Sequence, residues 1–359
     1  MSLSSPPSFP TLSRNTTLDN IKGVLIFLVV FGHFIEVHIS NDAFLRPIWV
    51  FVYAFHMPMF ALVSGIFSKA YLDETQSLQL IKNIVAPLLG MECIYELTEY
   101  ALQGSMSVYA GLVAPYWMLW YLLSLLCWRL LLPLFARLQF PVLLAVVLAL
   151  LGSYSAQAGY FLSGARTLMF FPYFLLGYSL GTNWLRNYKQ VYLIAALAIA
   201  ALAALAVTLL PDNFDYRWLY GSFSLQRLGM ANVHGTLYQL LQFAVSTTLG
   251  LAMLYLLARR DLGLARIGRQ SMYVFLWHGM ALIILQHYGI LSQILHMEAA
   301  TRLCLSLAAS AAIVWLTAHP YCERITQIVI LRPLSWLLLR ASANRADPLG
   351  LAKETVQPK

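Results

Sequence analysis

The first apolar stretch of the chain carries two ionisable residues at a spacing that can support chemistry. Lys22 and His33 lie close to three helical turns apart, so both side chains share one face, about 16 Å apart along the helix axis. An ionisable group inside a bilayer is costly to bury and is functional by default. The spacing predicts a helix face that lines an aqueous path, with a cation near the water and a proton-transfer group at mid-depth.

His33 is the strongest catalytic candidate. A neutral imidazole can take a proton from an alcohol as it attacks an acyl carbon. Glu36 lies on nearly the same face and can orient that imidazole or stabilise its charge. His278 lies about 12 Å into a later apolar run, a depth similar to that of His33, which predicts that both face one cavity. The alternative for each is a polar contact between packed helices.

Other residues are candidates for binding rather than catalysis. Lys22 with Asp19, and Lys82 ahead of Pro87, offer cations for phosphate groups, although an interfacial salt bridge is the simpler explanation of the first pair.

A second group is predicted to bind substrate. His56 precedes Pro58, which can kink the helix and open space beside it, so His56 is either a partner in the site or the donor that satisfies the kink. Aromatic side chains at the outer mouth of a span belong by default to the interfacial belt, with carbohydrate stacking as the alternative. The predicted substrate-binding residues are His56, Trp117, Trp120, Tyr121 and Arg166.

The composition requires a membrane as solvent for most of the chain. Of 359 residues, 60% are hydrophobic and 11% are charged, more apolar surface than a soluble chain of this length can bury. We expect an all-α bundle of about ten transmembrane spans. The apolar runs lie at 20–39, 47–69, 79–102, 114–135, 140–157, 165–182, 190–210, 234–258, 271–289 and 298–318. The fifth and sixth are short and rich in flanking Gly, Ser and Pro, so one of them is expected to be tilted or re-entrant.

The charges predict the topology. Ten spans put both termini on one side, and most Lys and Arg residues fall on that side, which predicts an N-in, C-in protein of the cytoplasmic membrane. Residues 1–15 and 341–359 are expected to be cytoplasmic tails, the first disordered, and 320–340 an interfacial helix. The net charge of +8 reflects topology rather than nucleic-acid binding, and the four cysteines show no metal-ligand or redox spacing, so no metal site is expected.

An ordered set of motifs resembles one family of membrane proteins. The pieces are Leu18-Asp19-x-x-Lys22 with His33, Phe55-His-Met-Pro-Met-Phe60 with Ser64-Gly65, Leu119-Trp-Tyr-Leu122, Phe171-Pro-Tyr-Phe-Leu-Leu-Gly177-Tyr, and Gly268 through His278. In order and spacing they resemble the acyltransferase-3 family, particularly its fucose 4-O-acetylase-like branch. The resemblance spans roughly residues 14–285 and implies an acyltransferase domain over 16–319.

The resemblance implies a bacterial inner-membrane enzyme. Such enzymes transfer an acyl group, here expected to be acetyl, from cytoplasmic acyl-CoA to a sugar hydroxyl of a surface or exported polysaccharide, with a lipid-linked glycan or polysaccharide-assembly proteins as partners. The family's first-helix basic residue and histidine map onto Lys22 and His33. Its paired-arginine motif in the third span is reduced here to Gln79-x-x-Lys82. The alternative function is a transporter or flippase for a glycan or small anion, with His33, Glu36 and His278 as a proton relay.

Overall fold

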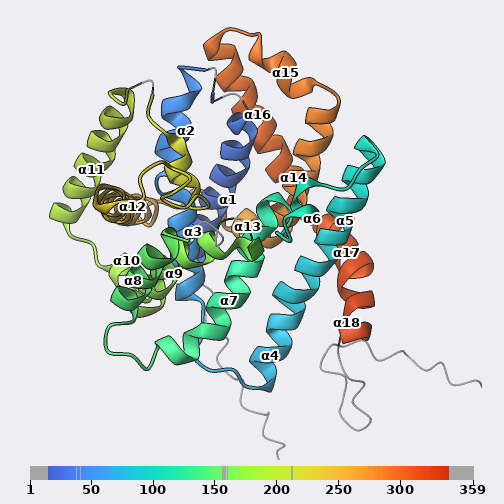
Figure 1. Cartoon of the computed structure of the whole chain (residues 1–359), viewed down its shortest axis with the longest axis horizontal. Coiled ribbons are helices and arrows are strands. Elements are labelled where there is room, and N and C mark those ends of the chain that lie inside the picture. The colour runs from blue at the N-terminus through green and yellow to red at the C-terminus, as the bar shows by residue number, and fades with distance from the viewer. Residues whose placement is uncertain are drawn as a thin grey trace, which may run out of the picture.

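The fold is a bundle of helices around a single central helix (Figure 1). The computed structural model describes residues 15–37, 39–40, 42–155, 159, 161–211 and 213–338, and within these ranges every regular element is a helix. The predicted tails at 1–14 and 341–359, and the last two residues of the predicted interfacial helix, lie outside the described residues. The all-α prediction is confirmed.

Helix α1 (Thr16–Glu36) forms the centre of the bundle. Asn15 starts it, because its side chain accepts the backbone N–H of Leu18 at 3.3 Å and so caps the first turn. Most of its apolar residues are buried, since other helices surround it on several sides. The helices in contact with it are α2 (Leu45–Tyr53), α3 (His56–Ile66), α12 (Val233–Leu257), α13 (Ala265–Arg269), α14 (Ser271–His287) and α16 (Ala299–Thr317).

The remaining elements complete the bundle in chain order. Those in the first half are α4 (Glu74–Leu80), η1 (Ile81–Val85), α5 (Ala86–Gln103), α6 (Val108–Gly111), η2 (Trp117–Leu119), α7 (Trp120–Phe135) and α8 (Pro141–Ser153). Those in the second half are η3 (Phe161–Ser163), α9 (Gly164–Leu180), α10 (Asn183–Arg186), α11 (Gln190–Thr208), η4 (Tyr216–Tyr220), α15 (Ile290–Leu295), α17 (Pro320–Thr326), η5 (Gln327–Leu331) and α18 (Arg332–Leu338). Elements η1 and η5 are π-helical turns.

The ten predicted apolar runs differ in the length of the helices that they form. Helices occupy all ten predicted apolar runs, but only seven helical stretches in the described chain are long and apolar enough to cross a membrane. The three that fall short are α8 with 13 residues and α9 and α14 with 17 each. At 1.5 Å per residue, α8 is about 20 Å long, against roughly 30 Å of hydrocarbon. The protein is a multi-pass membrane protein, and its fifth apolar run, expected to be short, forms a helix shorter than a full span.

The break between α2 and α3 confirms the kink predicted at Pro58. The two helices form one apolar stretch, Leu45–Ile66, which is interrupted at Ala54 and Phe55. A proline ring clashes with the carbonyl four residues earlier and cannot donate to it, and here that carbonyl belongs to Ala54.

Helices α3 and α9 pack with their backbones almost in contact. A Cβ added at Gly65 would lie 1.9 Å from the carbonyl oxygen of Phe174, and one at Gly177 would lie 1.9 Å from that of Leu62. Only glycine fits at either position, so two small residues from different motifs fix one helix crossing.

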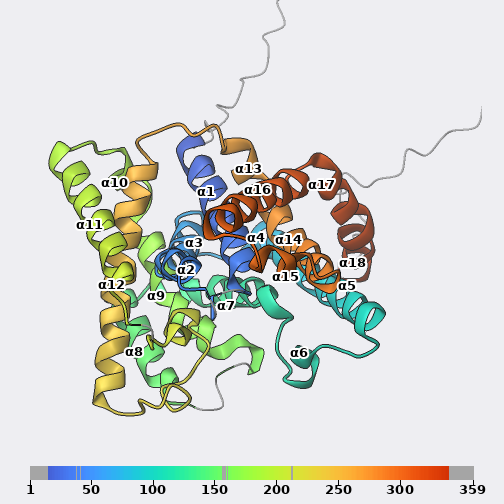
Figure 2. The same cartoon turned by 90° about the horizontal axis from the view of Figure 1, so that it is seen from above.

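The flanks of the bundle are less buried than its centre. Helices α11 and α12 lie side by side along one edge, and α5 lies with the C-terminal helices along the opposite edge (Figures 1 and 2). Of the 19 residues of α11, only Ala196 is buried, as expected of a helix that faces lipid. The predicted interfacial segment is helical over Pro320–Leu338, in three consecutive parts.

Candidate functional site

The first turns of α1 are held in place by a polar contact and a close approach. The Asn20 side chain donates to Asp261 at 2.8 Å and accepts the backbone N–H of Leu264 at 2.8 Å. The backbone N–H of Gly263 and the Asn20 amide together keep the pKa of Asp261 below its usual range. A Cβ at Gly268 would lie 1.7 Å from the Asp19 carbonyl oxygen, so α13 can rest directly on α1. This fixes the helix that carries His33.

His33 is oriented by a carboxylate and a phenol. Its Nδ1 lies 2.9 Å from Oε2 of Glu36, and the Tyr53 hydroxyl donates to the same oxygen at 2.9 Å. A carboxylate only accepts, so Nδ1 donates to it, and in the neutral imidazole Nε2 keeps the lone pair. Gly32 makes this possible, because a Cβ there would lie 2.8 Å from the Tyr53 ring. In the described chain, His33 Nε2 has no hydrogen-bond partner.

His278 lies against His33 at a similar depth, as predicted, but it does not line the cavity beside His33, so the two histidines do not share that cavity. The two imidazole rings are stacked with centroids 5.7 Å apart. Nδ1 of His278 donates to the Val274 carbonyl at 2.9 Å, and its Nε2 is buried with no hydrogen-bond partner among the described residues. In their neutral forms the two neighbouring imidazoles both present an unprotonated Nε2, the form needed to accept a proton or a hydrogen bond from a hydroxyl. We call His33, Glu36, Tyr53 and His278 the His33 cluster.

A cavity of about 50 Å³ opens beside this cluster. Its lining combines three members of the cluster, His33, Glu36 and Tyr53, with aromatic and apolar side chains from six stretches of the chain. The lining residues are Val29, His33, Glu36, Tyr53, His56, Met57, Trp117, Met118, Trp120, Arg166, Phe170, Leu219, Tyr220 and Phe275. The volume holds a few waters, and larger ligands need the helices around it to separate.

Four of the five predicted substrate-binding residues line this cavity. Trp117 packs edge-on to His33 with centroids 4.9 Å apart, and Arg166 lies 5.1 Å from the Trp120 ring. Tyr121 lies elsewhere. Its hydroxyl forms a hydrogen bond with Ser64 Oγ at 2.7 Å and donates to the Phe60 carbonyl. Tyr121 therefore connects α7 to α3 and does not line the cavity.

His56, the fourth of these residues, satisfies the kink and also lies at the cavity. Its Nδ1 donates to the Val52 carbonyl at 2.9 Å, which satisfies backbone at the broken end of α2. The ring also lines the cavity and packs against Tyr53 with centroids 4.6 Å apart.

Acidic residues of α5 hold Trp117 over the site. Both oxygens of Glu92 accept the backbone N–H of Tyr116, at 3.0 and 3.1 Å, and the Tyr116 hydroxyl donates to Glu99 at 2.8 Å. The next residue, Trp117, has φ of +31°, a left-handed conformation that costs about 1–3 kcal/mol in a residue other than glycine. The hydrogen bonds of Tyr116 to Glu92 and Glu99 hold the strained backbone of Trp117 in place beside His33.

The sequence did not single out two residues of the site, Tyr53 and Tyr220. Tyr220 ends η4, in the connection between α11 and α12, and its phenol has a raised pKa because of burial and the nearby charge of Glu36. Gly32 beside His33 was a signal that a ring approaches there. Tyr220 has no such signal, because its position depends on how a long connection folds back.

At the N-terminal end of α1, Lys22 is paired with an acidic residue, and the helix face that leads from it to His33 is covered. Lys22 forms a 2.8 Å ion pair with Asp19, and its ammonium lies 4.8 Å from the Phe67 ring. On the face between Lys22 and His33, Ile26 and Val29 are 0% and 2% exposed, and the cavity reaches Val29 but not Lys22. The open path predicted along this face is therefore closed in the structure.

Lys82, the other predicted phosphate ligand, lies away from the cavity. It is part of η1, the π-helical turn between α4 and α5, and it is partly exposed. A π turn accommodates one extra residue in a helix and is frequent at functional sites.

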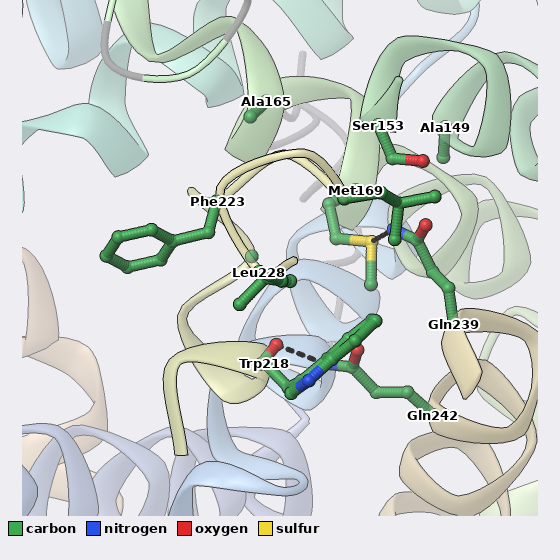
Figure 3. A pocket seen from close by; sticks show the side chains of 11 residues that line it. Ala149, Ser153, Ala165, Met169, Trp218, Phe223, Leu228, Gln239 and Gln242 are labelled. Atoms are coloured by element: carbon green, nitrogen blue, oxygen red, sulfur yellow. Dashed lines mark hydrogen bonds between the residues drawn. The ribbon is translucent and has the colours of Figure 1, made fainter. Parts of the chain in front are cut away.

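A second cavity, about 20 Å³ in volume, lies between α8, α9, α12 and the connection before α12 (Figure 3). Gln242 donates to the Trp218 carbonyl at 2.9 Å and Gln239 to the Met169 sulfur at 3.0 Å, while both amide oxygens are buried without a partner among the described residues. The space holds about one water, which these oxygens would bind. Its size makes it a structural feature rather than a substrate site.

Comparison with known proteins defines the class of this chain. The acyltransferase-3 profile, described as an acyltransferase domain, matches residues 15–319, so the chain belongs to the acyltransferase-3 family. The chain is 27% identical over 215 residues to the nodulation protein NolL of Sinorhizobium fredii, covering 54% of this chain and 57% of that protein. It is 40% identical over 62 residues to NolL of Mesorhizobium japonicum, 16% of this chain and 17% of that protein. The chain thus matches about half the length or less of these proteins, and no solved structure matches it.

Proposed function

We propose that this protein is a membrane O-acyltransferase that transfers an acetyl group, or another short acyl group, from acyl-CoA to a sugar hydroxyl of a surface or exported polysaccharide. One observation carries the proposal. A histidine deep in a bundle of the acyltransferase-3 family has Nδ1 held by a carboxylate, while its Nε2 is unpartnered within the described chain beside a cavity. That arrangement suits a general base for an alcohol.

His33 acts as that base. Its Nε2 takes the proton of the sugar hydroxyl as the oxygen attacks the thioester carbonyl, so a C–O bond forms and the C–S bond breaks. The proton passes from Nε2 to the departing thiolate of CoA. Glu36 accepts from Nδ1 throughout, which keeps the ring oriented and stabilises the imidazolium that forms. The Tyr53 hydroxyl holds that carboxylate in place.

The surrounding residues position the two substrates. His278, with an unprotonated Nε2 beside His33, accepts a hydrogen bond from a second hydroxyl of the sugar. Trp117 and Trp120 stack on the sugar ring, and Arg166 stabilises the charge that develops on the acyl oxygen. His56 completes the wall of the site.

The acyl donor enters from the end of α1 that carries Lys22. Lys22, with its partner Asp19, and Lys82 contact the phosphates, and the pantetheine arm lies along α1 towards His33. Because Ile26 and Val29 close that face, entry requires the helices packed on them to separate. The acceptor enters from the opposite end, past Trp117.

The proposed setting is the bacterial inner membrane with both termini in the cytoplasm. The acceptor is a lipid-linked glycan or polysaccharide, and proteins of polysaccharide assembly are expected neighbours. The positive-inside distribution of Lys and Arg supports this orientation.

The test compares two histidine variants of the full chain in lipid nanodiscs. The protein is incubated with acetyl-CoA labelled in the acetyl group and with membranes from cells that lack the gene. We expect the wild type to transfer label to glycan and to release CoA. His33→Ala should abolish transfer, whereas the matched control His287→Ala, an exposed histidine at the end of α14, should leave it unchanged.

Two results contradict the proposal. Label transfer that survives His33→Ala removes His33 from the mechanism. Uptake of labelled glycan or acetyl-CoA into sealed vesicles without CoA release indicates transport rather than acyl transfer.

A further inference from the structure

A half-buried cation outside the His33 cluster, Arg129, has no acidic partner among the described residues. Arg129 lies in the second half of α7, and its guanidinium donates to Oε1 of Gln76 at 3.0 Å and to Oγ of Ser68 at 3.4 Å. Its Nε is buried and makes no hydrogen bond within the described chain. Both partners are neutral, and no carboxylate of the described residues pairs with the guanidinium.

A half-buried guanidinium with only neutral partners is stabilised by a bound anion. Removing a guanidinium from water is costly unless it is paired and hydrogen-bonded, and two neutral acceptors leave its charge uncompensated. Arginine is also the side chain whose planar donors match a phosphate group in a bidentate contact.

Arg129 lies at the same end of the bundle as Lys22. Ser68, its hydrogen-bond partner, directly follows Phe67, whose ring contacts the Lys22 ammonium. Lys69 comes next in the chain and is exposed. Three cations from α1, the end of α3 and α7 therefore surround one helix terminus, and among them Lys22 is paired with Asp19.

The depth of Arg129 matches the length of the donor. Trp120 lines the cavity at the start of α7, and Arg129 follows nine residues later, about 14 Å along the helix axis. Lys22 lies about 16 Å from His33 along α1. An extended pantetheine arm covers such a distance from its phosphates to its thioester.

We propose that Arg129 binds a phosphate of the acyl-CoA donor. The contact with Gln76 places Arg129 beside α4, one turn before Gln79, the first member of the reduced Gln79-x-x-Lys82 motif. This assignment rests on the proposed function and adds a residue that the sequence motifs do not indicate. The phosphate of an anionic lipid has the same chemistry, so the experiment separates the two sources.

The experiment measures equilibrium binding of two donors to the full chain in phosphatidylcholine nanodiscs. Acetyl-CoA carries the phosphates, and acetyl-pantetheine lacks them. Arg129→Gln should weaken acetyl-CoA binding about tenfold or more, as expected for loss of a charge-assisted hydrogen bond, and should leave acetyl-pantetheine binding unchanged. Arg129→Lys keeps a positive charge and should lose less affinity for acetyl-CoA than Arg129→Gln does.

Two matched variants separate charge from packing. Ser68→Ala removes a hydrogen bond of Arg129 but keeps its charge, and it should change acetyl-CoA affinity by less than about threefold. Arg137→Gln removes an exposed arginine beyond the end of α7 and should change neither affinity.

Three outcomes overturn the assignment. Unchanged acetyl-CoA binding by Arg129→Gln removes the residue from the donor site, and equal losses for both donors show that it only supports packing. A loss seen solely in nanodiscs with anionic lipid assigns Arg129 to a lipid headgroup. Wild-type protein that binds neither donor refutes the proposed function itself, which distinguishes that failure from the other three.

Discussion

Replacing Glu36 with glutamine tests the proposed orientation of His33 with the smallest possible change in shape. The carboxylate accepts two hydrogen bonds at Oε2, both 2.9 Å long, from His33 Nδ1 and from the Tyr53 hydroxyl. Glutamine keeps the volume but removes the negative charge. Its amide NH2 can also turn towards Nδ1, which would then have to accept and would leave the proton on Nε2.

The size of the effect follows from these contacts. A hydrogen bond to a charged group contributes about 1.5–3 kcal/mol, and each 1.36 kcal/mol of barrier changes a rate about tenfold. Loss of the charge alone predicts a fall in kcat of about 10- to 150-fold. If the wrong tautomer dominates, the loss approaches the roughly 10⁴-fold seen when an amide replaces the triad aspartate of a serine protease.

The assay is the initial rate of CoA release by full-length protein in nanodiscs, with saturating acetyl-CoA and acceptor membranes. Glu36→Gln should lower kcat and leave the KM for acetyl-CoA unchanged, because Glu36 contacts His33 rather than the donor. Tyr53→Phe is the matched smaller change. It removes one donor to Glu36 but keeps the charge, and it should cost about two- to tenfold in kcat.

A wild-type kcat in Glu36→Gln would refute the reasoning, provided that the variant melts at the wild-type temperature. So would a larger loss in Tyr53→Phe than in Glu36→Gln, since the phenol acts through the carboxylate.

Three further changes test the packing that supports the site. Gly177→Ala should destabilise the protein by about 1–3 kcal/mol or more in thermal melts, because its Cβ meets backbone at 1.9 Å, whereas Gly111→Ala, with open space around it, should be neutral. Asn20→Ala should lower Tm by about 2–4 °C through the lost contact with the 261–264 loop, and an unchanged Tm would show that the loop does not brace α1. Trp117→Ala should admit water to His33, so the ratio of free acetate to acetylated glycan should rise; a constant ratio would remove Trp117 as a barrier to water.

The sequence determined the class of fold and the helix face on which the candidate site lies. Apolar runs and helical periodicity require a helical membrane bundle, since a chain in lipid must satisfy its backbone within each segment. The same periodicity placed Lys22, His33 and Glu36 on one face, and depth alone paired His33 with His278, whose rings are 5.7 Å apart. Composition could not separate full spans from short apolar helices such as α8, because the two are equally apolar. They differ in the residue at which the helix ends, which hydropathy does not mark.

Tertiary structure decided which polar residues meet. Tyr53 reaches Glu36 because a broken helix and Gly32 bring its ring onto α1, and Tyr220 arrives from a connection far along the chain. Tyr121 follows Trp120 directly, yet one helical step turns it away from the cavity towards Ser64. Periodicity fixes the face of a single helix but not the rotation of one helix against another. That rotation depends on contacts such as the glycine crossing of α3 and α9, which are made between residues distant in sequence.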